Sequence, residues 1–163
     1  MDRGITMLNN GQKVFVPNYG AGILNDVLDN KKYDINKKYV SISFLLNDIE
    51  LYIPENKLPD YKVRSVLDKE VMEEAFDIIK ENPVGIEKKW GKRYRQNNDK
   101  IKNGNTFKIC EVVRDLYYLK SQGALPLGEK KILYKAEMML ASEVSLVFDI
   151  ITEEALIKVR QLR

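Results

Sequence analysis

The chain changes its hydrophobic pattern near residue 60. From Gln12 onward, short segments rich in β-branched and aromatic residues alternate apolar and polar positions, which is typical of half-buried strands. These segments are QKVFVP, GAGILNDVLD, KKYVSISFL and DIELYIP, and the turn-forming stretches NYG, NKKYDINKK and LND separate them. The pattern predicts a small antiparallel β-barrel of four or five strands, of SH3 or Tudor type, over about residues 11–63.

After Leu58-Pro59-Asp60 the apolar positions recur with a period of 3.6, which indicates helices to the end of the chain. Asp68 is the expected N-cap of the first helix, and Gly104 closes the second. The remaining boundaries predict helices over about residues 86–102, 106–122 and 127–141, with a last one beginning near 143 or 152. The expected fold is therefore α+β, with a β domain over residues 1–63 and an all-α bundle of about five helices over residues 64–163.

The composition excludes several kinds of chemistry. The chain has no histidine and one cysteine, Cys110, which lies among apolar residues and is expected to be buried. Cys/His zinc sites, Ser-His-Asp triads and Cys-His nucleophiles are therefore ruled out. Gly20-Ala21-Gly22 lacks the features of a phosphate-binding loop, and we expect a tight turn there, with glycine supplying a positive φ or a close backbone approach.

These exclusions lead us to expect a protein that is not an enzyme and has no metal, no cofactor and no small-molecule substrate. No apolar run approaches the roughly 18 residues that a membrane span needs. The first residues, MDRGITMLNN, also lack the apolar core of a signal peptide. We therefore expect a cytoplasmic protein without a membrane partner.

Positive charge is concentrated between residues 86 and 108. This stretch, IEKKWGKRYRQNNDKIKNGNTFK, has eight Lys or Arg against two acids, a local net charge of +6 in a chain whose total is +3. Trp90, the only tryptophan, lies at its centre. Basic side chains interleaved with aromatic rings suit a polyanion that can accept a flat ring between stacked planes. The stretch therefore predicts a nucleic-acid interface, whose candidate residues beside Trp90 include Lys89, Lys92 and Arg93.

Two interpretations of Trp90 compete. A single tryptophan in a helical segment is often a core anchor, and a basic run is often only a solvated helix face. However, the neighbours of Trp90 are Lys89 and Gly91, and glycine is about 1 kcal/mol worse than alanine inside a helix. A helix built for packing would seldom place it beside its largest apolar side chain. We therefore favour an exposed Trp90 near a helix start.

Several motifs resemble one family. KVFVPNYGAGIL and DIELYIP are similar to the polymerase-interacting module that CarD-type bacterial transcription regulators share with transcription-repair coupling factors. In the C-terminal half, KKWGKRYRQN, EVVRDLYYLK and LGEKKILYKAEMML look like three runs of the CarD (or CdnL) helical domain, in the same order. The resemblance covers about residues 11–150. Each motif is weak alone, but the combination of a Tudor-like domain with this helical module is specific.

The resemblance implies a function as well as a fold. CarD-type proteins join a Tudor-like domain, which docks on the β subunit of RNA polymerase, to a helical domain that contacts promoter DNA at the upstream edge of the transcription bubble. A tryptophan of that family wedges into the minor groove, and Trp90 occupies its place. The basic contacts of the family fall here on Lys92, Arg95 and Lys130.

The polymerase-facing positions match the family less well. Members often place arginines where this chain has Asn30 and Tyr52, and the adjacent Lys31 and Lys32 could substitute for them. The hypothesis is a non-catalytic regulator that binds the polymerase β subunit through residues 11–63 and stabilises the promoter open complex through Trp90. Two alternatives stay open: a free-standing, non-specific DNA-binding protein, and a protein-interaction adaptor in which Trp90 is buried.

Overall fold

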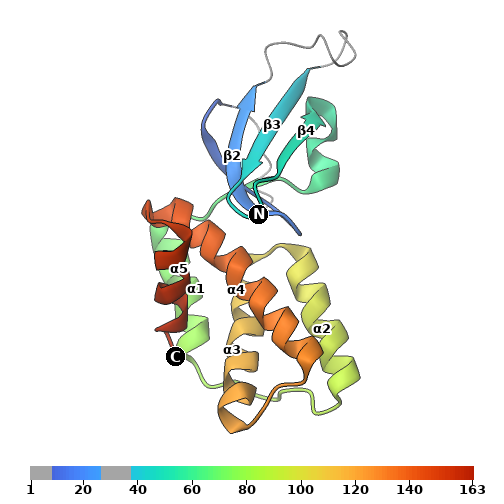
Figure 1. Ribbon diagram of the computed structural model, residues 1–163, viewed down its shortest axis with the longest axis vertical. Helices are drawn as coiled ribbons and strands as arrows, with labels where there is room; N and C mark the ends of the chain where they lie inside the picture. The colour runs from blue at the N-terminus through green and yellow to red at the C-terminus, as the bar shows by residue number, and fades with distance from the viewer. Residues whose placement is uncertain (1–8, 27–37) are drawn as a thin grey trace.

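The computed structural model describes residues 9–26 and 38–163, which form a sheet domain followed by a helical domain (Figure 1). The sheet domain has five antiparallel strands in the order β4-β3-β2-β1-β5. A 3₁₀ helix, η1 (Glu55–Tyr61), lies between the fourth and fifth strands. The strands are β1 (Gln12–Val16), β2 (Gly20–Asp26), β3 (Tyr39–Phe44), β4 (Glu50–Pro54) and β5 (Arg64–Ser65). The predicted strands are confirmed, and β5 is an addition that two residues are too few to reveal by pattern.

The two faces of β1 contribute to two different cores. Val14 and Val16 belong to the apolar core of the sheet domain, together with residues such as Leu24 and Ile42. Phe15, between them, points the other way because side chains alternate along a strand, and it belongs to the core of the helical domain. The helix that covers this face is α4, which packs against β2 (Figure 1).

Five helices follow the sheet: α1 (Lys69–Lys80), α2 (Trp90–Asn103), α3 (Thr106–Gln122), α4 (Leu127–Phe148) and α5 (Thr152–Arg160). The prediction for α3 is confirmed at both ends. Asp68 is the N-cap residue of α1, although its side chain makes no capping hydrogen bond. Among the described residues, no helix is long and apolar enough to cross a membrane.

Two predicted boundaries were wrong. The basic helix begins at Trp90 rather than near residue 86, because Gly85 has a φ of +69° and the chain stays non-helical through Lys89. The fourth helix does not end at 141 but continues to Phe148, so of the two starts considered for the last helix, 152 is confirmed and 143 is wrong.

The glycines near the start of β2 meet both expectations for them. Gly20 has a φ of +92°, in the left-handed region that favours glycine. A Cβ atom on Gly22 would lie 2.6 Å from the backbone oxygen of Ser43 on β3. This turn is therefore structural: it lets β2 approach its neighbours closely.

Helix α4 is the centre of the helical domain and carries three buried glutamates, each paired with an arginine from another element. Glu129 pairs with Arg93 of α2, Glu137 with Arg160 of α5, and Glu143 with Arg64 of β5. A buried carboxylate without a partner costs several kcal/mol, so each pair is tolerated only when both members are present. The three pairs thus fix which element packs against each part of α4.

Candidate nucleic-acid interface

Trp90 is the first residue of α2, and 66% of its surface is exposed. Residues four or seven positions apart lie on the same face of a helix. Trp90 therefore shares a face of α2 with Asn97 and Ile101, which are both buried against neighbouring elements. Trp90 lies about two turns before Asn97 and about three before Ile101, where this face runs past the end of the packed region. The prediction that this side chain is exposed at a helix start is confirmed.

Four cationic side chains and Trp90 line one shallow surface hollow: Lys88, Lys89, Lys92 and Arg95. All four are exposed. Lys92 is 3.3 Å from Glu87, whose carboxylate also accepts a hydrogen bond from the backbone N–H of Lys89 at 3.1 Å. These contacts, the Lys89 bond first and then Lys92, lower the pKa of Glu87. Glu87 therefore stays ionised, and its contacts with Lys89 and Lys92 hold the segment that leads into α2.

Within α2 itself, the first turn carries no acid, and Glu87 is the negative group that precedes it. Lys89 is the N-cap residue, and no side chain caps the helix. The first backbone N–H groups of a helix lack partners within it and carry the positive end of the helix dipole. This end of α2 thus adds backbone donors to the four side-chain charges, and the combined field favours an anion such as a phosphate.

Arg93 occupies a different place from the other predicted DNA-binding residues. Its side chain is only 13% exposed, and its guanidinium binds both carboxylate oxygens of Glu129, the second at 2.8 Å from Nη2. Nη1 donates to the backbone carbonyl of Glu87 at 2.9 Å. The Glu129 hydrogen bond raises the pKa of Arg93, so the pair remains ionic. Arg93 holds the segment before α2, α2 itself and α4 together.

The start of α4 lies beside the exposed end of α2 (Figure 1). A Cβ atom on Gly128 would lie 3.3 Å from Cε2 of Tyr94, so the two helices approach closely here. Lys130, in the first turn of α4, is exposed at the same end as Trp90. Leu127 is 69% exposed there as well, and its exposure was not predicted because leucine side chains are more often buried.

The predicted polymerase-binding residues are only partly described. Tyr52 lies on β4, at one edge of the sheet, and is 41% exposed. Asn30, Lys31 and Lys32 lie outside the described residues. The roles in DNA contact and polymerase contact therefore both remain predictions. All six predicted DNA-binding residues lie in the described part of the chain, whereas only Tyr52 of the predicted polymerase-binding residues does.

Neither a reactive cysteine nor a metal-binding cluster accompanies this surface in the described part of the chain. Cys110 is fully buried on α3, as predicted, and burial raises the pKa of its thiol well above the ordinary range. Within residues 9–26 and 38–163, no three His, Cys, Asp or Glu residues are grouped so that they could hold a metal ion. What the arrangement can do chemically is to bind an anionic partner and present an aromatic ring to it.

Comparison with known proteins identifies the class of protein to which this fold and surface belong. Residues 74–160 match the family model described as CarD, C-terminal domain. This match covers more than half of the chain, which therefore belongs to the CarD/CdnL-type transcription regulators.

A full-length relative extends the comparison beyond the helical domain. The chain is 30% identical over 141 residues to the protein named "Putative transcription factor YdeB" from Bacillus subtilis (strain 168). The aligned part covers 86% of this chain and 92% of that relative. An alignment of this length includes strands of the sheet domain as well as the helices.

Proposed function

We propose that this regulator docks on the β subunit of RNA polymerase through its sheet domain and stabilises the promoter open complex with Trp90. In this proposal the indole enters the DNA minor groove at the upstream edge of the transcription bubble. One observation supports it above all: the only tryptophan of the chain is 66% exposed at the start of α2, among Lys88, Lys89, Lys92 and Arg95.

Physical chemistry gives the exposed ring its role. A large apolar surface in water is unfavourable, and inserting it at a distorted base step removes that surface from water while opposing re-closure of the duplex. The surrounding cations and the uncapped start of α2 would bind phosphates and fix the position of the ring. An insertion that favours the open state by about 1.4 kcal/mol changes the ratio of open to closed complexes about tenfold.

The sheet domain supplies the tether. β4 is an edge strand, and an edge can accept a strand from a partner while side chains such as Tyr52 add specificity. Because tethering raises the local concentration of the helical domain at the promoter, weak intrinsic DNA affinity is enough. Sequence specificity comes from the polymerase, since none of the helices in the described part of the chain resembles a recognition helix for the major groove.

The alternatives make different demands. A protein-interaction adaptor would bury Trp90, and the observed exposure argues against it. A free-standing DNA-binding protein would bind duplex DNA tightly at physiological salt without polymerase. A gel-shift experiment with duplex DNA alone separates that function from the proposed one, which expects weak binding without polymerase.

Replacing Trp90 by alanine tests the proposal. We expect Trp90→Ala to leave polymerase binding intact and to shorten the open-complex lifetime about tenfold, because only the inserted ring is lost. The measurement is the decay of heparin-resistant complexes with each protein at saturation. Ile157→Ala, which truncates an exposed apolar residue on α5, is the matched control and should leave the lifetime unchanged. An unaltered lifetime for Trp90→Ala contradicts the wedge role.

A further inference from the structure

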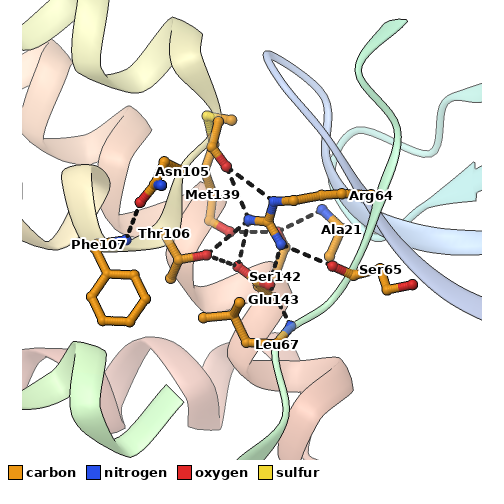
Figure 2. Close-up of polar contacts among 11 residues, drawn as sticks. Ala21, Arg64, Ser65, Leu67, Asn105, Thr106, Phe107, Met139, Ser142 and Glu143 are labelled. Carbon is orange, nitrogen blue, oxygen red and sulfur yellow. Dashed lines mark hydrogen bonds and ion pairs between the residues drawn. The ribbon is translucent and has the colours of Figure 1, made fainter. Parts of the chain in front are cut away.

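Arg64, in the short strand β5, reaches out of the sheet domain into the helical domain (Figure 2). Its Nη1 and Nη2 donate to the two carboxylate oxygens of Glu143 on α4, at 2.7 and 3.1 Å. Nε and Nη2 also donate to the carbonyl of Gly104, the C-cap of α2, at 3.2 and 3.0 Å. One guanidinium thus joins a strand of the sheet to two helices.

Glu143 collects further donors on the helical side. It is fully buried and accepts hydrogen bonds from the backbone N–H of Leu67 at 2.9 Å and from the hydroxyl of Thr106 at 2.6 Å (Figure 2). Arg64 Nη2 in turn donates to Thr106 Oγ1 at 2.8 Å. Because every polar atom in this group of three side chains has a partner, the group favours a single arrangement of the elements that carry it.

Close packing supports the same arrangement. The guanidinium of Arg64 lies over the ring of Phe15, 4.3 Å from its centroid. The backbone N–H of Ala21 donates to Ser142 Oγ on α4 at 3.0 Å. On the other side of the junction, a Cβ atom on Gly104 would lie 2.6 Å from Cγ of Pro17. The sheet and the helices therefore meet in close contact at three separate points of the junction.

Helix α2 connects this junction to Trp90. Its C-terminal end, Gly104, is held by Arg64 and touches Pro17, whereas Trp90 lies at its far end. Fourteen residues at 1.5 Å each make a rod of about 20 Å. A rotation of about 10° at the junction would therefore move Trp90 by roughly 3.5 Å, about one base-pair step.

We infer that Arg64 and Glu143 are positioning residues, which fix the distance and orientation between the sheet and Trp90. The inference rests on the proposed function: with the sheet on the polymerase, the junction determines where along the DNA the indole is presented. Neither residue touches DNA or polymerase in this scheme. Their effect is transmitted through α2.

The first test measures the geometry in the free, full-length protein. Spin labels at Ser43→Cys on β3 and Gln96→Cys on α2, both exposed positions, report the distance between the domains, while Cys110 is buried and stays unlabelled. Arg64→Lys keeps a positive charge but has one nitrogen in place of the three with which Arg64 holds both Glu143 oxygens and the Gly104 carbonyl. We expect a narrow distance distribution for the parent protein and a broad or shifted one for Arg64→Lys.

The matched control breaks a similar pair that does not cross the junction. Arg160→Ala removes the arginine partner of the buried Glu137 within the helical domain, where Glu137 keeps its hydrogen bond from Tyr117, so it lowers stability without freeing the sheet. Its distance distribution should stay narrow. If the distance distribution of Arg64→Lys is as narrow as that of the parent protein, the inference is overturned. It is also overturned if Arg160→Ala broadens the distribution as much as Arg64→Lys does, because the effect would then follow from lost stability alone.

The second test asks whether this geometry matters at a promoter. Arg64→Lys should bind polymerase normally and shorten the open-complex lifetime towards that of Trp90→Ala, and adding Trp90→Ala should cause no further loss. An unchanged lifetime despite a broadened distance overturns the positioning role. If the parent protein itself does not prolong open complexes, the proposed function fails, and the distance measurement still decides whether Arg64 couples the domains.

Discussion

The two ends of α2 are built in opposite ways. At the C-terminal end, Gly104 closes the helix in the left-handed conformation, its carbonyl accepts from Arg64, and Pro17 fills the adjacent space. At the N-terminal end no side chain caps the helix, the first turn is free of acids, and Trp90 is exposed. The polar and apolar groups at the C-terminal end find their partners within the protein. At the N-terminal end, backbone N–H donors, positive charge and the exposed surface of Trp90 are available to a partner.

This difference separates the residues that maintain the fold from those that can bind. Substitutions at the packed end should change stability, and substitutions at the exposed end should change binding while leaving stability nearly unaltered. Arg93 is the exception, because it lies at the exposed end but is paired with a buried carboxylate. Arg93 is therefore a residue of the fold, although Lys92 and Arg95, close to it in the sequence, belong to the proposed binding surface.

Two arginines in the first two turns of α2 give the largest expected contrast. Arg93→Ala leaves Glu129, which is 1% exposed, without its partner, and should lower the free energy of unfolding by about 3–5 kcal/mol. Arg95→Ala removes an exposed cation and should change it by less than about 0.5 kcal/mol. Urea denaturation followed by circular dichroism measures both. Similar losses for the two variants would show that burial does not distinguish these positions.

Two glycines sharpen the comparison between the ends. Gly104→Ala places a Cβ in the left-handed region and 2.6 Å from Pro17, and should cost about 2–4 kcal/mol of stability. Gly91→Ala meets nothing within 4 Å inside the helix and should stabilise by about 0.5–1 kcal/mol. Thermal melting gives both values. A destabilising Gly91→Ala would mean that the exposed end is strained rather than open.

Alkaline pH probes the packed region with a smaller effect. Burial first, and then the nearby Glu143, raise the pKa of Cys110 above its ordinary value of 9.0, so the folded state keeps a proton that the unfolded chain releases. The contribution of the protonated Cys110 thiol to the free energy of unfolding is fully present below pH 9. It is lost as the pH rises, which lowers the free energy of unfolding by about 1.4 kcal/mol near pH 10. Chemical denaturation at pH 8 and pH 10 measures this loss. Cys110→Ala should lose less stability over the same interval, and an equal loss would show that the dependence does not come from this thiol.

Local pattern predicted most of the fold, and it failed where a distant contact decides the structure. The sequence predicts an end of the fourth helix near residue 141, with the boundary to the last helix left open, whereas α4 continues to Phe148. In the structure Ser142 accepts from Ala21 of the sheet and Glu143 from Arg64, so these polar residues are buried partners of another domain. A pattern of single residues contains no information about such a partner.

The candidate site was predictable to a similar extent. Composition and the Lys89-Trp90-Gly91 sequence indicated an exposed ring in a basic stretch, and this is confirmed. Arg93 could not be separated from its basic neighbours, because its partner Glu129 is 36 positions away. The proposed polymerase surface depended on a family resemblance alone, and only Tyr52 of that set falls in the described residues.

The pairing of β5 with β1 has a practical consequence for dissecting the protein. A fragment that stops at Val63 loses Arg64 and Ser65, which pair with Phe15 and Val14, and it uncovers the ring of Phe15, which the Arg64 guanidinium covers in the intact chain. Such a fragment would be a poor competitor for the polymerase because its own folding is compromised. Point substitutions in the intact chain leave the apolar cores of both domains buried, and are therefore the better way to separate the roles of the two domains.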